Sequence, residues 1–297
     1  DDGTVSRLDE ITFRMTCAEP NLRWLEENAR RLDVAIEDVS ESTAALALQG
    51  PASRAILQQL ADADLQSVPF FGLIGTRLRG IPVTVSRTGY TGDLGFELWV
   101  DADDALPLWD ALVEAGSSYG ITPAGMLALD IARIEAGLML IDVDYVPARK
   151  ALTASQTSSP FELDLGWAVK LEKEHFVGKP ALVAESRSAP QWRFVGIEIA
   201  WEALERLYAE AGLAPQLPHA AWRTSVPLYA AGRQAGYATS GTWSPLLKKY
   251  IALAHVGAQW SAAGTQLEME VTVEHQRKRA RATVVQKPFF NPERKRT

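Results

Sequence analysis

Hydrophobic and polar positions follow two periods along the first part of the chain. Alternation with period two predicts strands, and apolar residues that recur every three or four positions predict helices. Up to about Glu185 the two patterns take turns, which predicts an α+β domain. In chain order the predicted elements are a strand at Phe13–Cys17, a helix at Asn21–Leu32, a strand at Ala44–Leu48, a helix from Pro51 through Leu60, a strand pair within Ile81–Val100, a helix from Asp103 or Asp104 to near Gly116, and a helix at Ala124–Ala136.

A polar stretch at 186–191 reads as a linker, after which the pattern changes. Short alternating segments separated by turns predict a small antiparallel barrel or sandwich. We therefore predict two domains, 1–185 and 192–290, and a solvated tail at Asn291–Thr297. The later segments are strands at Arg193–Ile199, Val226–Tyr229, Gly236–Ser240, Ile251–Val256, Leu267–Val273 and Ala280–Gln286, with a helical insertion at Trp201–Glu210.

The composition limits the function classes. With 297 residues and 47% hydrophobic residues, the chain can form two or three units with substantial cores. A net charge of −7 argues against nucleic acid as a partner. No apolar run is as long as a membrane span and no signal peptide is visible, so we expect a cytoplasmic location without membrane contact. The single cysteine, Cys17, fits a reducing compartment.

Common cofactor and catalytic motifs are absent from the sequence. The four histidines are scattered, and none stands at metal-ligand spacing from Cys17 or from another histidine, so no metal site is predicted. There is no Walker loop and no G-x-G-x-x-G, which leaves nucleotide binding without a motif. A G-x-S-x-G elbow, expected in a serine hydrolase of the α/β type, is also missing.

The segment SRTGYTGDLGFELWV, residues 86–100, places one carboxylate, Glu97, inside an otherwise apolar strand. Gly89, Gly92 and Gly95 can adopt positive φ or let a ligand approach the backbone. A strand carboxylate usually faces water. The residues alone therefore leave two interpretations open, a solvated hairpin side chain or a group that binds a ligand.

Six stretches, in this order along nearly the whole chain, resemble the glycine-cleavage T-protein (aminomethyltransferase) family of folate-dependent one-carbon transferases. They are LALQGPASRAIL (46–57), RTGYTGDLGFEL (87–98), GMLALDIARIEAGLML (125–140), FVGKPAL (176–182), TSGTWSPLLKKYIALAHV (239–256) and KPFF (287–290). The resemblance implies a cloverleaf of α+β subdomains around a tetrahydrofolate channel, followed by a C-terminal antiparallel β-barrel. It also implies a further N-terminal segment that would precede Asp1.

The resemblance assigns a folate-binding role to Glu97, because the carboxylate at this position recognises the pterin ring in the family. A pterin presents neighbouring N–H donors on one edge, and a carboxylate can accept both in a charge-assisted pair. Tyr90 is expected to pack near the ring, and Arg133 and Trp243 lie in matching stretches and are further candidates for the cofactor site. Core packing is the alternative role for Trp243.

Asp1 and Asp2 match an Asp-Asp pair that begins a strand in the family. The resemblance implies that the first carboxylate lies near the reactive folate nitrogens, so Asp1 is the candidate catalytic residue and Asp2 the second choice. Such a carboxylate can orient an amine and stabilise developing positive charge. Solvation at the chain start is the alternative for both residues.

The helix in the third stretch departs from the family. T-proteins have an Arg-Asp pair there, and this chain has Leu129-Asp130. The missing arginine contacts ligand in the family, so its loss is expected to favour a different substrate head group. The sequence LIDVDY, ending at Tyr145, also replaces the family's LYGxD. We therefore expect Leu129, Asp130 and Tyr145 to determine the substrate, although Asp130 and Arg133 can instead form a pair on the helix surface.

The resemblance favours a tetrahydrofolate-dependent one-carbon transferase that acts on a small-molecule donor. In the T-protein reaction the donor is an aminomethyl group on a lipoyl carrier protein, which would then be a partner. One alternative is a folate-dependent demethylase with a methylated sulfur, oxygen or nitrogen donor. The other is a non-catalytic folate-binding protein, whose Lys-Gly-Cys-Tyr motif is absent here.

Overall fold

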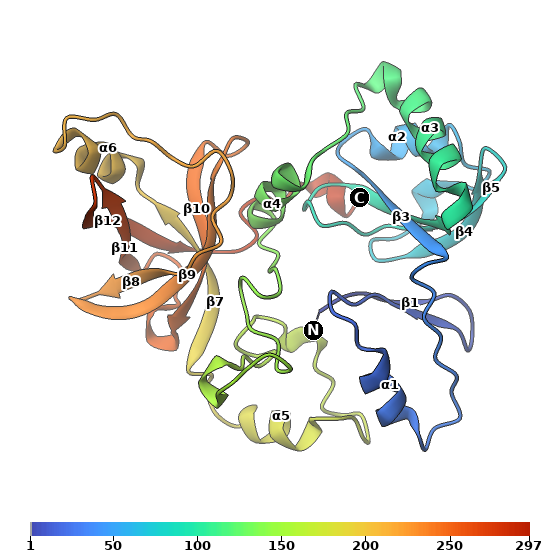
Figure 1. Ribbon diagram of the computed structural model, residues 1–297, viewed down its shortest axis with the longest axis horizontal. Helices are drawn as coiled ribbons and strands as arrows, with labels where there is room; N and C mark the ends of the chain where they lie inside the picture. Colours follow the sequence, from blue (N-terminus) through green and yellow to red (C-terminus); the bar gives the residue numbers. More distant parts are fainter. Residues whose placement is uncertain (1) are drawn as a thin grey trace. The chain divides into compact units, whose positions relative to one another are not determined.

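The computed structural model describes residues 2–297 (Figure 1). The chain divides into two compact units, residues 1–124 together with 291–297, and residues 125–290. The domain boundaries predicted from the sequence, 1–185 and 192–290, stay a prediction. Within residues 2–297, no helix is both long and apolar enough to cross a membrane.

The first unit is built on a four-stranded antiparallel sheet with strand order β3-β6-β5-β4. Buried aliphatic side chains of one sheet face pack with two helices into a core that includes Ile56, Phe96, Leu98 and Leu108. The elements of this unit are β1 (Val5–Arg7), β2 (Phe13–Met15), α1 (Leu22–Ala29), β3 (Thr43–Gln49), α2 (Ser53–Gln58), η1 (Leu65–Ser67), β4 (Leu73–Leu78), β5 (Ile81–Ser86), β6 (Gly95–Asp101), η2 (Ala102–Asp104), α3 (Ala105–Gly116), η3 (Ser117–Tyr119) and η7 (Glu293–Lys295).

The alternation of β6 decides where Glu97 points. Phe96 and Leu98 are fully buried in the core, and successive strand residues point to opposite faces. Glu97 and Trp99 therefore lie on the other face of the sheet. Glu97 is directly opposite Ala47 on β3 and Ser86 on β5.

The C-terminal tail belongs to the first unit, and most of its residues are exposed as predicted, although hydrogen bonds hold it to the unit. Two arginines hold the carbonyl oxygen of Thr297, with Arg87 Nη2 at 2.7 Å and Arg54 Nη2 at 2.8 Å. Arg294 donates two hydrogen bonds to the Asp93 carboxylate, at 2.7 and 2.8 Å. The basic tail is thus ordered by a carboxylate in the glycine-rich segment, a long-range partner that the local sequence does not reveal.

The second unit contains a closed antiparallel barrel with strand order β10-β7-β12-β11-β8-β9. Small and aliphatic residues such as Ile197, Leu228 and Ala252 fill its core, and α6 packs against it. The elements of this unit are α4 (Met126–Glu135), η4 (Ala154–Gln156), η5 (Gly166–Ala168), α5 (Lys179–Glu185), β7 (Trp192–Ile199), α6 (Trp201–Ala209), β8 (Val226–Ala230), β9 (Arg233–Ser244), β10 (Lys249–Gly257), η6 (Ala258–Trp260), β11 (Gln266–Val273) and β12 (Gln276–Val285).

The structure confirms the predicted α+β unit followed by an antiparallel barrel, with several local differences. The short strands β1 and β4 and the helix α5 were not predicted. Helix α1 ends at Ala29 rather than Leu32, and Leu32 is exposed. Asp104 occupies the N-cap position of α3, one of the two predicted, but its side chain makes no capping hydrogen bond. Asp101 accepts the Asp103 N–H at 3.0 Å and caps the short 3-10 turn that precedes α3.

We predict that Gly236→Ala destabilises the barrel, because an added Cβ would lie 2.1 Å from the carbonyl oxygen of His255 on β10. Overpacking of this kind reduces the free energy of unfolding by about 1–3 kcal/mol. Thermal unfolding followed by circular dichroism measures the effect. The control is Gly75→Ala in β4, where an added Cβ meets no atom within 4 Å. Equal melting temperatures for the two variants would contradict the prediction.

Candidate functional site

Glu97 ends a chain of hydrogen bonds on the outer face of the first unit's sheet. The Trp99 indole Nε1 donates to Ser86 Oγ at 3.2 Å, and Ser86 Oγ lies 2.9 Å from Thr88 Oγ1. Thr88 in turn donates to Glu97 Oε2. The other carboxylate oxygen, Oε1, has no hydrogen-bond partner among residues 2–297, and Glu97 is only half-buried. The strand thus presents a fixed carboxylate with one open acceptor.

The glycines beside Glu97 have a structural reason that the sequence did not reveal. An added Cβ would lie 2.0 Å from Gln49 Oε1 at Gly89 and 2.1 Å from it at Gly95. The Gln49 side chain occupies this space and donates to the carbonyl oxygens of Thr88 and Phe96, at 3.2 Å each. Among Gly89, Gly92 and Gly95, Gly92 alone has a positive φ. The loop is therefore shaped around a glutamine side chain.

A cleft of about 940 Å³ opens along the same unit, and Trp99, Thr84 and Arg14 contribute to its lining. The Arg14 guanidinium lies over the Trp99 ring at 5.1 Å from its centroid, and burial lowers the Arg14 pKa. Trp99 connects this cleft to the hydrogen-bond chain of Glu97. Tyr90 is half-buried in the loop that precedes β6.

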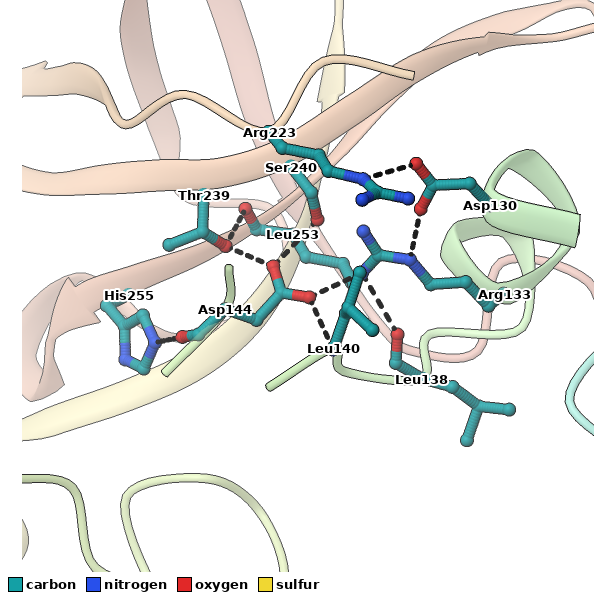
Figure 2. Close-up of polar contacts among 10 residues, drawn as sticks. All are labelled: Asp130, Arg133, Leu138, Leu140, Asp144, Arg223, Thr239, Ser240, Leu253 and His255. Atoms are coloured by element: carbon teal, nitrogen blue, oxygen red, sulfur yellow. Dashed lines mark hydrogen bonds and ion pairs between the residues drawn. The ribbon is translucent and has the colours of Figure 1, made fainter. Parts of the chain in front are cut away.

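The second unit contains a buried network of arginines and aspartates (Figure 2). Arg133, on α4, is 1% exposed, and its Nε donates to Asp130 Oδ1 at 2.8 Å. Its Nη1 donates to Asp144 Oδ2 and to the Leu138 carbonyl, the latter at 3.3 Å. Asp130 and Arg133 thus do form the i,i+3 pair considered from their spacing. The pair lies in the interior rather than on the helix surface.

Asp144 joins α4 to the barrel strands. Its Oδ2 accepts the Leu140 N–H at 2.8 Å in addition to Arg133, and its Oδ1 accepts the hydroxyls of Thr239 and Ser240, the latter at 2.7 Å. The His255 ring Nε2 lies 2.6 Å from the Asp144 carbonyl oxygen. A carboxylate with this many donors is held in one orientation, and it fixes the loop from Leu138 to Tyr145 against β9 and β10.

Asp130 binds a second cation, which the sequence analysis missed. Arg223, in the loop before β8, donates from Nε to Asp130 Oδ2 at 2.8 Å and is 47% exposed. The expectation that Leu129 removes the cation from this neighbourhood is therefore incomplete, since two guanidinium groups flank the adjacent carboxylate. No local pattern marks Arg223, because its partner is 93 positions away in the sequence.

The remaining predicted residues occupy different environments. Tyr145 is buried in a cluster with Ile134 and Phe194. Trp243 is partly buried, packs against Trp201 at a centroid distance of 5.0 Å and contacts the barrel core. Leu129 and Asp2 are half-buried, and Asp1 lies outside the described residues. The roles assigned to these residues from the sequence stay predictions.

Comparisons with known proteins agree with this architecture. The family model of the GCVT N-terminal domain matches residues 1–173, and that of the glycine cleavage T-protein C-terminal barrel domain matches residues 211–291. The first match alone covers more than half of the chain. The chain belongs to the glycine-cleavage T-protein family. The resemblance drawn from the six sequence stretches is thereby confirmed.

Similar T-proteins cover most of the chain. An aminomethyltransferase of Geobacillus thermodenitrificans is 40% identical over 274 residues, 92% of this chain and 67% of that protein. One from Halalkalibacterium halodurans is 35% identical over 296 residues, 98% of this chain and 72% of that protein. The crystal structure of the glycine cleavage system aminomethyltransferase T from Bartonella henselae has a TM-score of 0.76 at 25% identity, covering 98% of this chain and 72% of that one.

We predict that Asp144→Asn reduces the free energy of unfolding by about 3–5 kcal/mol, because it removes one of the two carboxylates that pair with the buried Arg133. The control is Asp142→Asn, which breaks the exposed pair with Lys150, where both side chains are 43% exposed. Its expected effect is below about 1 kcal/mol. Urea denaturation measures both variants, and a similar small effect at Asp144 would show that the network does not stabilise the unit.

His255 predicts a pH dependence of stability. Burial lowers its pKa, against the opposing effects of its hydrogen bond to the Asp144 backbone and of the charges of Asp144 and Glu162. The unfolded chain therefore binds a proton near pH 6.5 that the folded chain binds only at lower pH, so stability falls as the pH drops from about 7 to 5. Urea titrations at several pH values measure the free energy of unfolding, and its decrease between about pH 7 and 5 should be smaller in His255→Gln than in wild type. An equal decrease in the two proteins would contradict the prediction.

Proposed function

We propose that this protein is a tetrahydrofolate-dependent one-carbon transferase of the aminomethyltransferase type. Its similar relatives are named aminomethyltransferases, and both T-protein domain models match the chain. The observation that carries the proposal is the Glu97 carboxylate, which Thr88 fixes through one oxygen while the other oxygen stays open for a donor.

The residues around Glu97 fit a pterin. The carboxylate is half-buried, and the opposite face of its strand is a rigid core, so its orientation is defined. One open acceptor oxygen, with the second oxygen shared with a hydroxyl, suits the adjacent N–H donors of the pterin edge. Tyr90, Arg133 and Trp243 remain candidates for further folate contacts. Bound folate supplies the nitrogen that accepts the one-carbon group.

Asp1, with Asp2 as the second candidate, is proposed to orient the donor amine and to stabilise positive charge that develops on it. Because the chemistry uses a nitrogen of folate, the enzyme's contribution is mainly to position the two reactants and to exclude water. In this proposal Asp1→Asn keeps the affinity for folate and lowers turnover.

The donor is proposed to be a small molecule selected near Leu129, Asp130 and Tyr145. An aminomethyl group on a lipoyl carrier protein is the donor in the T-protein reaction, and the carrier is then a partner. The half-buried, apolar Leu129, in place of the family's arginine, favours a second candidate, a folate-dependent demethylase with a methylated donor.

We predict that Glu97→Gln weakens tetrahydrofolate binding about five- to hundredfold, because the charge-assisted pair with the pterin becomes a neutral one. Anaerobic calorimetric titration measures the dissociation constants. The matched control is Glu114→Gln in the same unit, where Glu114 is 69% exposed and pairs with Arg79. Unchanged affinity in Glu97→Gln would remove Glu97 from the folate site. Folate binding without turnover for any donor would favour a non-catalytic binding protein.

A further inference from the structure

We infer that Arg223 and Arg133 form a binding site for a substrate carboxylate beside Asp130. The inference rests on the proposed function and adds to it the chemical class of one substrate group. Both arginine Nε atoms lie 2.8 Å from oxygens of the same carboxylate, that of Asp130. The two guanidinium groups are therefore neighbours, and Figure 2 shows a terminal nitrogen of Arg133 pointing toward the Arg223 guanidinium.

Several N–H donors of this site have no hydrogen-bond partner within residues 2–297. Arg133 Nη2 is buried and has no hydrogen-bond partner among residues 2–297. An unsatisfied buried N–H of a charged group is destabilising, so such groups usually bind a water or a ligand. The terminal nitrogens of Arg223 likewise have no partner within the described chain, since its one hydrogen bond is made through Nε.

The geometry of the open guanidinium edge favours a ligand with two acceptor oxygens, such as a carboxylate, over a ligand with a single acceptor atom. A guanidinium that is bound through Nε leaves the edge between Nη1 and Nη2 open, and this edge matches the two oxygens of a carboxylate. Arg223 is 47% exposed, so a ligand can reach this edge. The direction of the Arg223 guanidinium is fixed by Asp130, which pairs with Arg133, and Arg133 is held in turn by Asp144. The site is pre-organised rather than formed by a flexible surface arginine.

Directed N–H groups, not net charge, would hold the ligand. The network contains two guanidinium groups and two carboxylates, so it is neutral before a ligand binds. Arg223→Lys should therefore lose most of the affinity even though it keeps the charge, because a lysine presents no two-nitrogen edge. The carboxylate can come from the glutamyl tail of folate or from an amino-acid donor.

The experiment compares ligands with and without a carboxylate in wild type, Arg223→Gln and Arg223→Lys. The first pair is tetrahydrofolate and 6-methyltetrahydropterin. The second pair is N-methylglycine and dimethylamine, titrated in the presence of 6-methyltetrahydropterin. Calorimetry measures each dissociation constant, and the melting temperature shows that each variant is folded. The control is Arg233→Gln, an exposed arginine of the same unit whose side chain makes no hydrogen bond or ion pair within residues 2–297.

In both Arg223 variants we expect the affinity for one of the two carboxylate ligands, tetrahydrofolate or N-methylglycine, to fall about tenfold or more. The affinity for the matching compound without a carboxylate should not change. A loss confined to tetrahydrofolate identifies the glutamyl tail, and a loss confined to N-methylglycine identifies the donor. Equal losses within each pair, or none, would overturn the carboxylate site and leave the proposed function intact if wild type binds 6-methyltetrahydropterin. If wild type binds neither pterin compound, the proposed function fails and the carboxylate site fails with it.

Discussion

The ion pair between Arg133 and Asp144 is the interaction on which the second unit depends. Both side chains are almost fully buried, so neither charge can be left without the other. Asp144 also binds hydroxyls of β9, and Arg133 binds Asp130, which in turn fixes Arg223. One buried pair therefore determines how α4, the loop to Tyr145 and the barrel strands fit together. The half-exposed Arg223 is positioned by the same contacts.

In the first unit, the contacts around β6 hold one carboxylate, that of Glu97, in a fixed orientation. The core side chains of β6 set the face on which Glu97 lies, and the Thr88 hydroxyl sets the direction of its carboxylate. Gln49 fills the space that Gly89 and Gly95 leave, so the glycine-rich loop keeps one shape. These contacts are local to the sheet and need no ligand to form, as expected of a pre-organised binding site.

Much of the fold and part of the candidate site could be predicted from the sequence, and the features that could not be predicted share a physical cause. Alternation predicted the barrel strands and the strand that contains Glu97, because strand periodicity is a local property. Arg223, the docked tail and Gln49 were missed, because each acts through a partner far away in the sequence. Asp144 lies in the stretch that departs from the family. The hydroxyls that donate to it, those of Thr239 and Ser240, begin the stretch 239–256 that matches the family. Asp144 and these two residues are far apart in the sequence, and only the fold brings them into contact.

The most direct test of the account is an anaerobic calorimetric titration of tetrahydrofolate into the wild-type protein. The account predicts binding of one tetrahydrofolate per chain, with a dissociation constant of about micromolar order, as is typical of enzymes and their substrates. Absence of binding at millimolar tetrahydrofolate would contradict it. The fixed carboxylate of Glu97 would then serve another ligand, although the chain has the fold of the T-protein family.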